Sequence, residues 1–367
     1  MRNHKIGILT IHFGRNYGSV LQAFALNSYI SGLGFDVETI NYIPSRFSLI
    51  ERYKAAHGKN PMIMIVASIL RFPKNCKQYH LFARFVRENI KLSRKATNYE
   101  QLNQVSDAYS CVIVGSDQVW NSEYNKDDQQ HYFLDFCDSN TVKASYAASF
   151  GTDEIDEQTR ILIDKYLKLF RAVSVREKVG VCLLKQQGIY SEKSIDPVFL
   201  LDNATWKRFL SKSTLERYVA VYALGGKEEE VVRYAKYVAK ELDAEVCYIG
   251  FRKLKDRDIK QNLYASPDDF LNLINNACFV ITNSFHATSF SIIFKKQFIT
   301  VGRDRFNSRI TDVLDLLRLS DRLVTSYNEE VISNLTHTDI DYVSAYELLE
   351  DQKRLSMRYL EELLNGQ

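Results

Sequence analysis

The chain has 367 residues, 46% of them hydrophobic and 25% charged, so it is long enough for about two globular domains and is not a disordered protein. Its 48 basic and 45 acidic residues leave a net charge of only +3. This near balance argues against a nucleic-acid-binding protein, which usually carries a strong positive excess.

The first predicted elements open a doubly wound α/β sheet. Residues 5–13 form an apolar, β-branched run that is typical of a buried strand. Helical spacing over residues 19–30 and a second strand over residues 36–42 follow, separated by a polar loop and by glycines. This β–loop–α–β order is the beginning of a Rossmann-like sheet.

A basic block comes next, over residues 46–95. It contains twelve lysines and arginines but only two acidic residues, Glu51 and Glu88, so it carries +10 while the rest of the chain carries −7. Residues 81–90 within it have the apolar spacing of a helix. Such a block is either a solvated face or a contact for an anionic partner.

The sheet pattern then resumes and is followed by a second α/β series. Strands are expected over residues 110–114, 143–150, 172–175, 218–224, 245–249, 279–282 and 298–301, with helices between them and a long helix over about 343–364. We therefore predict an α/β protein with two Rossmann-like domains that face a cleft. The expected divisions are an N-terminal domain over 1–212 with the basic block as a helical insertion, a C-terminal domain over 213–335, and a helix over 336–367 that packs back on the N-terminal domain.

Three features predict a cytoplasmic protein without a metal site. The six cysteines form no Cys-x-x-Cys pair, and several lie in apolar runs, so buried reduced thiols are expected. The N-terminus leads directly into an apolar run, with no signal peptide. The longest apolar stretch, residues 62–70, is too short to span a bilayer.

Ligands of such folds bind at the carboxyl ends of the strands, so the loops after the strands are the candidate sites. His12 lies at the end of the first strand, before the loop Asn16-Tyr17-Gly18-Ser19. The start of the helix there presents backbone N–H groups to an anion or to a sugar hydroxyl. The alternative is a plain helix start with Ser19 as its N-cap.

The loop after residues 110–114 places a carboxylate, Asp117, beside Gln118 and Trp120. A carboxylate at a strand end can orient a hydroxyl or take its proton. Trp120 either stacks on a sugar ring or fills the core. Arg176, after the strand over 172–175, can grip a carboxylate or a phosphate with two hydrogen bonds, or it forms an ion pair with a neighbouring acid.

The most specific signal is the polar turn between two apolar runs over residues 279–294. It holds Asn283, Ser284, His286 and Thr288 at the start of a predicted helix. The positive end of that helix and these donors suit a phosphate. The alternative is a histidine with only a structural role.

In this order, these segments resemble the polysaccharide pyruvyl transferase family. The matching segments are NYGSVLQAFAL (16–26), VIVGSDQVWN (112–121), YAASFG (146–151), SVRE (174–177), DPVFLL (196–201) and FVITNSFHATSFSIIF (279–294). The resemblance implies a GT-B-type glycosyltransferase-like architecture. It also implies transfer of a pyruvyl group from phosphoenolpyruvate to two hydroxyls of a sugar, which forms a ketal and releases phosphate, with no metal or organic cofactor.

The resemblance further implies that phosphoenolpyruvate is held by arginines and by a histidine in an Arg-Leu-His-like turn. Here Ser284-Phe285-His286 keeps the histidine, but Ser284 stands where the arginine would be. The missing cation would come from one of a set of basic residues: Arg176, Lys296, Arg303, Arg305 or Arg309. We expect His286, Asp117 and Arg176 to be catalytic, and the donor to be held by Arg176, Asn283, Ser284, His286, Thr288 and Arg309.

The acceptor side is expected to be lined by His12, Asn16, Tyr17, Gln118 and Trp120. The acceptor would be a sugar of a polysaccharide or of a lipid-linked precursor, and the basic block, with Met62–Phe72, would contact an anionic membrane. One alternative is a glycosyltransferase that uses a nucleotide sugar, with Gly225-Gly226-Lys227 near a diphosphate. Another is a non-catalytic protein that binds sugars or anions.

Overall fold

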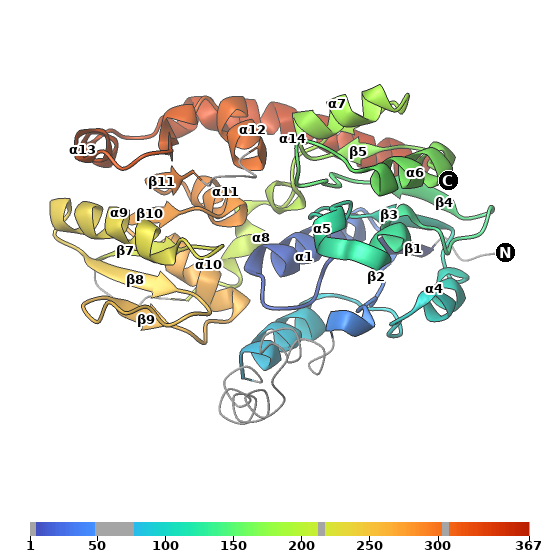
Figure 1. Cartoon of the computed structure of the whole chain (residues 1–367), viewed down its shortest axis with the longest axis horizontal. Coiled ribbons are helices and arrows are strands. Elements are labelled where there is room, and N and C mark those ends of the chain that lie inside the picture. The colour runs from blue at the N-terminus through green and yellow to red at the C-terminus, as the bar shows by residue number, and fades with distance from the viewer. Residues whose placement is uncertain (1–4, 48–76, 212–216, 303–307, 367) are drawn as a thin grey trace. The chain divides into compact units, whose positions relative to one another are not determined.

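The computed structural model describes residues 5–47, 77–211, 217–302 and 308–366 (Figure 1). The chain divides into two compact units: unit 1 is Met1–Pro197 with Arg358–Gln367, and unit 2 is Val198–Met357. The division falls after Pro197, whereas the sequence placed it after residue 212. Of the C-terminal helix, only the residues from Arg358 onward belong to unit 1.

The sheet of unit 1 is parallel and has the strand order β2-β1-β3-β4. Its strands are β1 (Lys5–Leu9), β2 (Asp36–Thr39), β3 (Cys111–Val114) and β4 (Val142–Ser145). The strands β5 (Ser174–Val175) and β6 (Glu192–Lys193) form a second, two-stranded sheet. A bridge between Ala144 and Ala172 brings the chain before β5 alongside β4. The order reverses between β1 and β3, which makes their carboxyl ends the topological switch point where ligands of open α/β sheets bind.

The helices of unit 1 are α1 (Tyr17–Gly32), a helix over residues 77–89, α4 (Tyr99–Ser106), α5 (Ser122–Asn125), α6 (Glu157–Tyr166) and α7 (Lys178–Gln186), with the 3₁₀ segments η1 (Ser45–Phe47), η2 (Lys126–Phe133) and η3 (Leu167–Leu169). Among them, α4, α6 and α7 contribute apolar residues to the same core as β1 and β3. Helix α1 is apolar on most of its circumference and is buried over most of its length, as expected for a helix inside a domain core.

Unit 2 contains a six-stranded parallel sheet with the order β12-β11-β10-β7-β8-β9. The strands are β7 (Tyr218–Tyr222), β8 (Glu245–Ile249), β9 (Lys260–Asn262), β10 (Phe279–Thr282), β11 (Phe298–Val301) and β12 (Leu323–Val324). The order reverses between β10 and β7, so the loops after these two strands lie at the switch point of this sheet.

The helices of unit 2 alternate with its strands, and α9 packs against β7 and β10 (Figure 1). They are α8 (Asn203–Lys207), α9 (Glu228–Glu241), α10 (Pro267–Asn276), α11 (Phe285–Ile293), α12 (Ser308–Leu316), α13 (Glu329–His337) and the part of α14 (Tyr342–Asn365) up to Met357. The 3₁₀ segments are η4 (Pro197–Phe199), at the start of the unit, and η5 (Ser320–Arg322), before β12. Helix α10 starts with a capping box, in which Ser266 and Asp269 each accept from the other's backbone N–H.

The predicted strands over residues 245–249, 279–282 and 298–301 are confirmed to the residue. Several predicted strands were longer than the observed ones, since residues 10–13, 40–42, 110, 146–150, 172–173 and 223–224 lie outside the strands. The proposed apolar contact at Met62–Phe72 lies outside the described residues. In the part of the chain that the structure describes, no helix is both long and apolar enough to cross a bilayer.

Candidate functional site

Four strand ends of unit 1 bring together a set of polar side chains, here called the strand-end cluster. It consists of Thr10, Ser19, Ser116, Asp117, Ser149, Arg176, Glu177 and Asp196, all of which are buried. Thr10, Ser116 and Ser149 follow β1, β3 and β4, and Arg176 follows β5 directly. Because parallel strands end at the same edge of a sheet, loops far apart in the sequence meet here.

Asp117 is held in an unusual backbone conformation, with a φ of 84°, which is uncommon for a residue with a side chain. Its backbone carbonyl accepts from the Ser149 N–H at 3.1 Å, which ties the loop after β3 to the loop after β4. Its carboxylate accepts from the Gln118 N–H at 2.8 Å and from the hydroxyl of Ser19 at the start of α1. Such outliers cluster at functional sites, and this one presents a carboxylate at the switch point.

Arg176 is engaged by carboxylates of its own unit. Its Nη1 donates to Asp196 Oδ2 at 2.5 Å and to Ser116 Oγ at 3.1 Å, and its Nε donates to Glu177 Oε1 at 3.2 Å. Burial by itself would lower the pKa of Arg176, but the charges of Glu177 and Asp196 raise it, so the guanidinium stays charged. These contacts are the ion pair that was the alternative to a donor-binding role, and contact with a donor remains a prediction.

The predicted acceptor residues have different surroundings. Asn16, not Ser19, caps α1: its side chain accepts from the N–H groups of Gly18 and Ser19. The alternative interpretation that made Ser19 the cap is therefore wrong. Tyr17 is buried, and its ring packs on Phe82 with the centroids 4.9 Å apart.

Trp120 lies in the core, as the alternative interpretation of this residue had it. It is 1% exposed, stacks on Phe133 at 5.4 Å and donates from Nε1 to Tyr132 O at 2.8 Å. Gln118 is only partly buried and accepts from Asn121 Nδ2 at 2.9 Å. Of these two residues, Gln118 is the one with surface left for a ligand.

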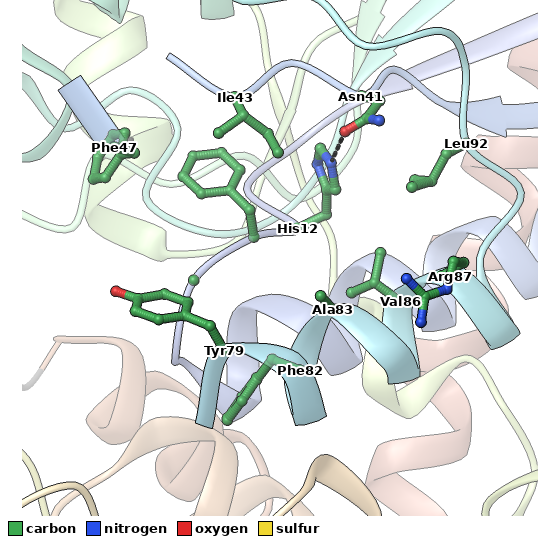
Figure 2. Close-up of a pocket in the computed structure, with 12 residues that line it drawn as sticks. His12, Asn41, Ile43, Phe47, Tyr79, Phe82, Ala83, Val86, Arg87 and Leu92 are labelled. Carbon is green, nitrogen blue, oxygen red and sulfur yellow. Dashed lines mark hydrogen bonds between the residues drawn. The ribbon is translucent and has the colours of Figure 1, made fainter. Parts of the chain in front are cut away.

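His12 lies at the inner end of a cavity of about 420 Å³, which we call the Phe13 pocket (Figure 2). Apolar side chains from the loops after β1 and β2 and from the helix over residues 77–89 line it, among them Phe13, Ile43, Phe47 and Tyr79. His12 Nδ1 is 3.1 Å from Thr10 O, and Nε2 is 3.2 Å from Asn41 Oδ1. Burial lowers the pKa of His12 more than these two contacts raise it.

In unit 2, the predicted turn lies at the switch point between β10 and β7. Ser284 is the N-cap of α11 and accepts from the Ala287 N–H, and His286 lies in the first turn of that helix with 7% of its surface exposed. The side chain of Asn283 holds both backbone groups of Leu224, which follows β7, at 2.8 and 2.9 Å. The Thr288 hydroxyl is bonded to Thr300 on β11 at 2.8 Å.

Two of the four polar residues of the turn, Asn283 and Thr288, hold neighbouring strands and loops, and the other two, Ser284 and His286, lie at the start of α11. Asn283 positions the loop after β7, and Thr288 bonds across to β11, so both side chains already have protein partners. Ser284 and His286 lie at the positive end of α11, where the field of the helix favours an anion.

The candidate cations differ in how well the structure defines them. Lys296 is partly buried, which lowers its pKa, and Arg309 is half-buried near the start of α12. Arg303 and Arg305 lie outside the described residues. Gly225 and Gly226 have φ values of 77° and 80°, but Glu228, Glu229 and Glu230 occupy the first turn of α9, and their charges oppose an anion there.

Several residues of the cluster were not among the predicted site residues. Ser19 and Asp117 are far apart in the sequence, as are Arg176 and Asp196, so no local spacing pointed to either pair. The segments SVRE and DPVFLL had been noted, but only the fold shows that they meet. Asn41 follows β2, and nothing in its sequence neighbourhood distinguishes it.

The model of the polysaccharide pyruvyl transferase family matches residues 16–305, and no curated protein sequence matches the chain. Similar solved structures include S. aureus MnaA with UDP (TM-score 0.56, 12% identity, 99% of this chain and 97% of that chain). Two others are UDP-GlcNAc 2-epimerases, from Neisseria meningitidis with bound UDP-GlcNAc (0.52, 9%, 99% and 100%) and from Methanocaldococcus jannaschii (0.50, 12%, 92% and 93%).

At these identities the structures show the fold, and the expected GT-B-type architecture of two Rossmann-like units is confirmed. The family match covers most of the chain. It includes the loops after β3 and β10, which carry Asp117 and His286. The chain therefore belongs to the polysaccharide pyruvyl transferase family, a family of transferases.

Proposed function

We propose that the protein transfers a pyruvyl group from phosphoenolpyruvate to two hydroxyls of a sugar in a polysaccharide or a lipid-linked glycan precursor. The observation that carries this proposal is the family match. The residues that it covers include polar groups at the switch points of both sheets. The products are a cyclic ketal and inorganic phosphate, and no metal or organic cofactor takes part.

The reaction has clear chemical requirements. A general acid protonates the methylene carbon of phosphoenolpyruvate, which becomes a methyl group and leaves an oxocarbenium-like centre. One sugar hydroxyl adds to this centre, phosphate departs, and the second hydroxyl closes the ring. The two hydroxyl protons balance the one gained by the methyl carbon and the one that leaves with phosphate. The site therefore needs anion-binding groups, an acid and a base.

His286 and Ser284 are proposed to meet the first two needs. They lie at the N-terminus of α11, where backbone N–H groups and the helix dipole favour a phosphate. His286, which lies beside that position, is proposed to donate the proton to the methylene carbon. Lys296 or one of Arg303, Arg305 and Arg309 would supply the charge that Ser284 lacks.

Asp117 is proposed as the group that orients the acceptor hydroxyl or takes its proton. Its carboxylate is fixed by Ser19 and Gln118 at the switch point of the unit 1 sheet, so little reorganisation would be needed during the reaction. Gln118 and Asn16 belong to the same group of loops and are proposed to contact the acceptor. Arg176, with its two carboxylate partners, is proposed to act by holding the loops after β3 and β5 in place.

The His286→Ala variant tests this assignment. We expect phosphate release in the presence of acceptor to fall about 10²–10⁴-fold, because an acid or base role is typically worth that much. Circular dichroism verifies that the variant is folded. His337→Ala is the matched control, because His337 is an exposed histidine at the end of α13, and it should keep full activity. Full activity in folded His286→Ala would remove the residue from the mechanism.

A glycosyltransferase that uses a nucleotide sugar remains the second candidate. It is favoured by the fold, since the similar solved structures include complexes with UDP and with UDP-GlcNAc. Against it stand the three glutamates that begin α9 next to Gly225 and Gly226, where the sequence had suggested a diphosphate. The two candidates differ in the donor that the protein binds.

A further inference from the structure

The Phe13 pocket has walls that suit an apolar group. The side chains of Phe13, Ile43, Phe47, Tyr79 and Leu92 line it and are only partly buried in the protein by itself. The rings of Phe13 and Phe47 are 5.1 Å apart and tilted by 58°, so they form a continuous aromatic surface (Figure 2). A volume of about 420 Å³ is within the range of small-molecule sites, which are mostly lined by apolar and aromatic side chains.

The polar groups at the inner end of the pocket already have partners. His12 Nδ1 faces the carbonyl oxygen of Thr10 at 3.1 Å and therefore donates to it. Nε2 faces the side-chain amide of Asn41 at 3.2 Å. A sugar ring placed among these walls would bury hydroxyls without partners, which is costly. Arg87, which also lines the pocket, is exposed, so its charge remains in contact with water. An alkyl or acyl chain has no hydroxyls to leave unpaired.

The pocket also lies beside the strand-end cluster. His12 and Phe13 are in the loop that follows β1. Thr10, two residues before His12, donates its hydroxyl to Ser116 O at 2.5 Å. Ser116 precedes Asp117. The inner end of the pocket is thus connected to the loop of Asp117 by a single hydrogen bond and a few residues of chain. A molecule whose hydroxyl reaches Asp117 could place a substituent in the pocket.

We propose that the Phe13 pocket is a subsite for an alkyl or acyl chain carried by the sugar acceptor. The proposal rests on the proposed function for the identity of the acceptor, but the binding of the chain itself is independent of catalysis. The chain packs between Phe13, Phe47 and Tyr79, and the sugar to which it is attached lies toward Asp117. The pocket therefore selects acceptors with an apolar substituent over the bare sugar.

Alkyl glucosides test the proposal by isothermal titration without phosphoenolpyruvate. Methyl, hexyl and octyl glucoside are compared below the micelle concentration of the octyl compound. Affinity should rise by about two- to fourfold for each added methylene, because burying a methylene is favourable by about that factor. Octyl glucoside carries its chain on the anomeric oxygen and 6-O-octanoylglucose carries it on the exocyclic O6, so the tighter of the two shows which attachment the pocket accepts. Equal affinity across the alkyl series would overturn the proposal.

Two variants of one helix locate the binding. Ala83 is exposed and lines the pocket, whereas His80 is exposed on the same helix and does not. Ala83→Trp, or the smaller Ala83→Leu if the first folds poorly, should weaken octyl glucoside binding at least tenfold and leave circular dichroism unchanged. His80→Trp should bind as the unmodified protein does. Loss in both variants, or in neither, would place the chain elsewhere.

The outcome separates this proposal from the proposed function. If chain-dependent binding is found but no acceptor supports phosphate release from phosphoenolpyruvate, the subsite stands and the pyruvyl transferase activity does not. If phosphate is released equally with methyl and octyl glucoside as acceptors and no chain-dependent binding is seen, the activity stands and the subsite does not.

Discussion

Replacing Asp117 with asparagine should lower the rate of phosphate release about 10²–10⁴-fold, because the amide cannot accept the proton of a sugar hydroxyl. The substitution suits the position, because asparagine tolerates the left-handed backbone that Asp117 adopts. Its amide oxygen can still accept from the Gln118 N–H, and its amide nitrogen can donate to the Ser19 hydroxyl oxygen. The fold should therefore be kept, and the loss should appear in the rate constant rather than in stability.

The measurement is steady-state phosphate release with phosphoenolpyruvate and acceptor, accompanied by circular dichroism. Asp107→Asn is the matched control, because Asp107 is an exposed aspartate at the end of α4 in the same unit, and its activity should not change. If Asp117→Asn keeps its activity within about threefold, Asp117 is not the base, and its strained backbone has another explanation.

Replacing Asp196 with alanine should lower the free energy of unfolding by about 3–5 kcal/mol, which is the usual cost of breaking a buried ion pair. The reason is that Arg176 is 4% exposed and would lose its closest carboxylate, while the more distant one of Glu177 remains. The Ser116 hydroxyl, which donates to Asp196 Oδ2 at 3.0 Å, would lose its acceptor as well. The effect is expected at the lower end of the range, since Glu177 remains.

Urea denaturation followed by fluorescence measures this change as a shift of the midpoint. Asp164→Ala provides the comparison. Asp164 on α6 forms an exposed ion pair with Lys168 of η3, and an exposed ion pair contributes about 0–1 kcal/mol. Equal midpoints for the two variants would show that the buried network around Arg176 does not stabilise unit 1.

Much of the fold could be predicted because its signals are local. Apolar, β-branched runs such as residues 279–282 and 298–301 match their strands, and the expected polar turn after the first of them begins α11. The termination of β1 at Leu9 could not be predicted, because residues 10–13 are still mostly apolar. Their side chains pack in the core and around the Phe13 pocket after the backbone has left the sheet.

The contacts within the candidate site were less predictable, because they join loops that are distant in the sequence. The sequence marked Arg176 as an anion-binding group, but the partners that compensate its charge follow from the packing of β5 against the segment before η4. Trp120 was weighed between a sugar platform and the core, and only the stacking on Phe133 decides for the core. Likewise, donor binding by Asn283 stays a prediction, and the sequence could not show its hydrogen bonds to Leu224, which position the loop after β7.

The most direct test of the pyruvyl transferase proposal is a thermal-shift comparison of phosphoenolpyruvate with UDP-sugars, because it identifies the donor without requiring the acceptor. A ligand that binds only the folded protein stabilises it by about 2.7 kcal/mol at a hundred times its Kd, which corresponds to a shift of a few degrees for a chain of this size. The account predicts that phosphoenolpyruvate raises the Tm and that UDP-sugars do not. A rise with a UDP-sugar and none with phosphoenolpyruvate would contradict it.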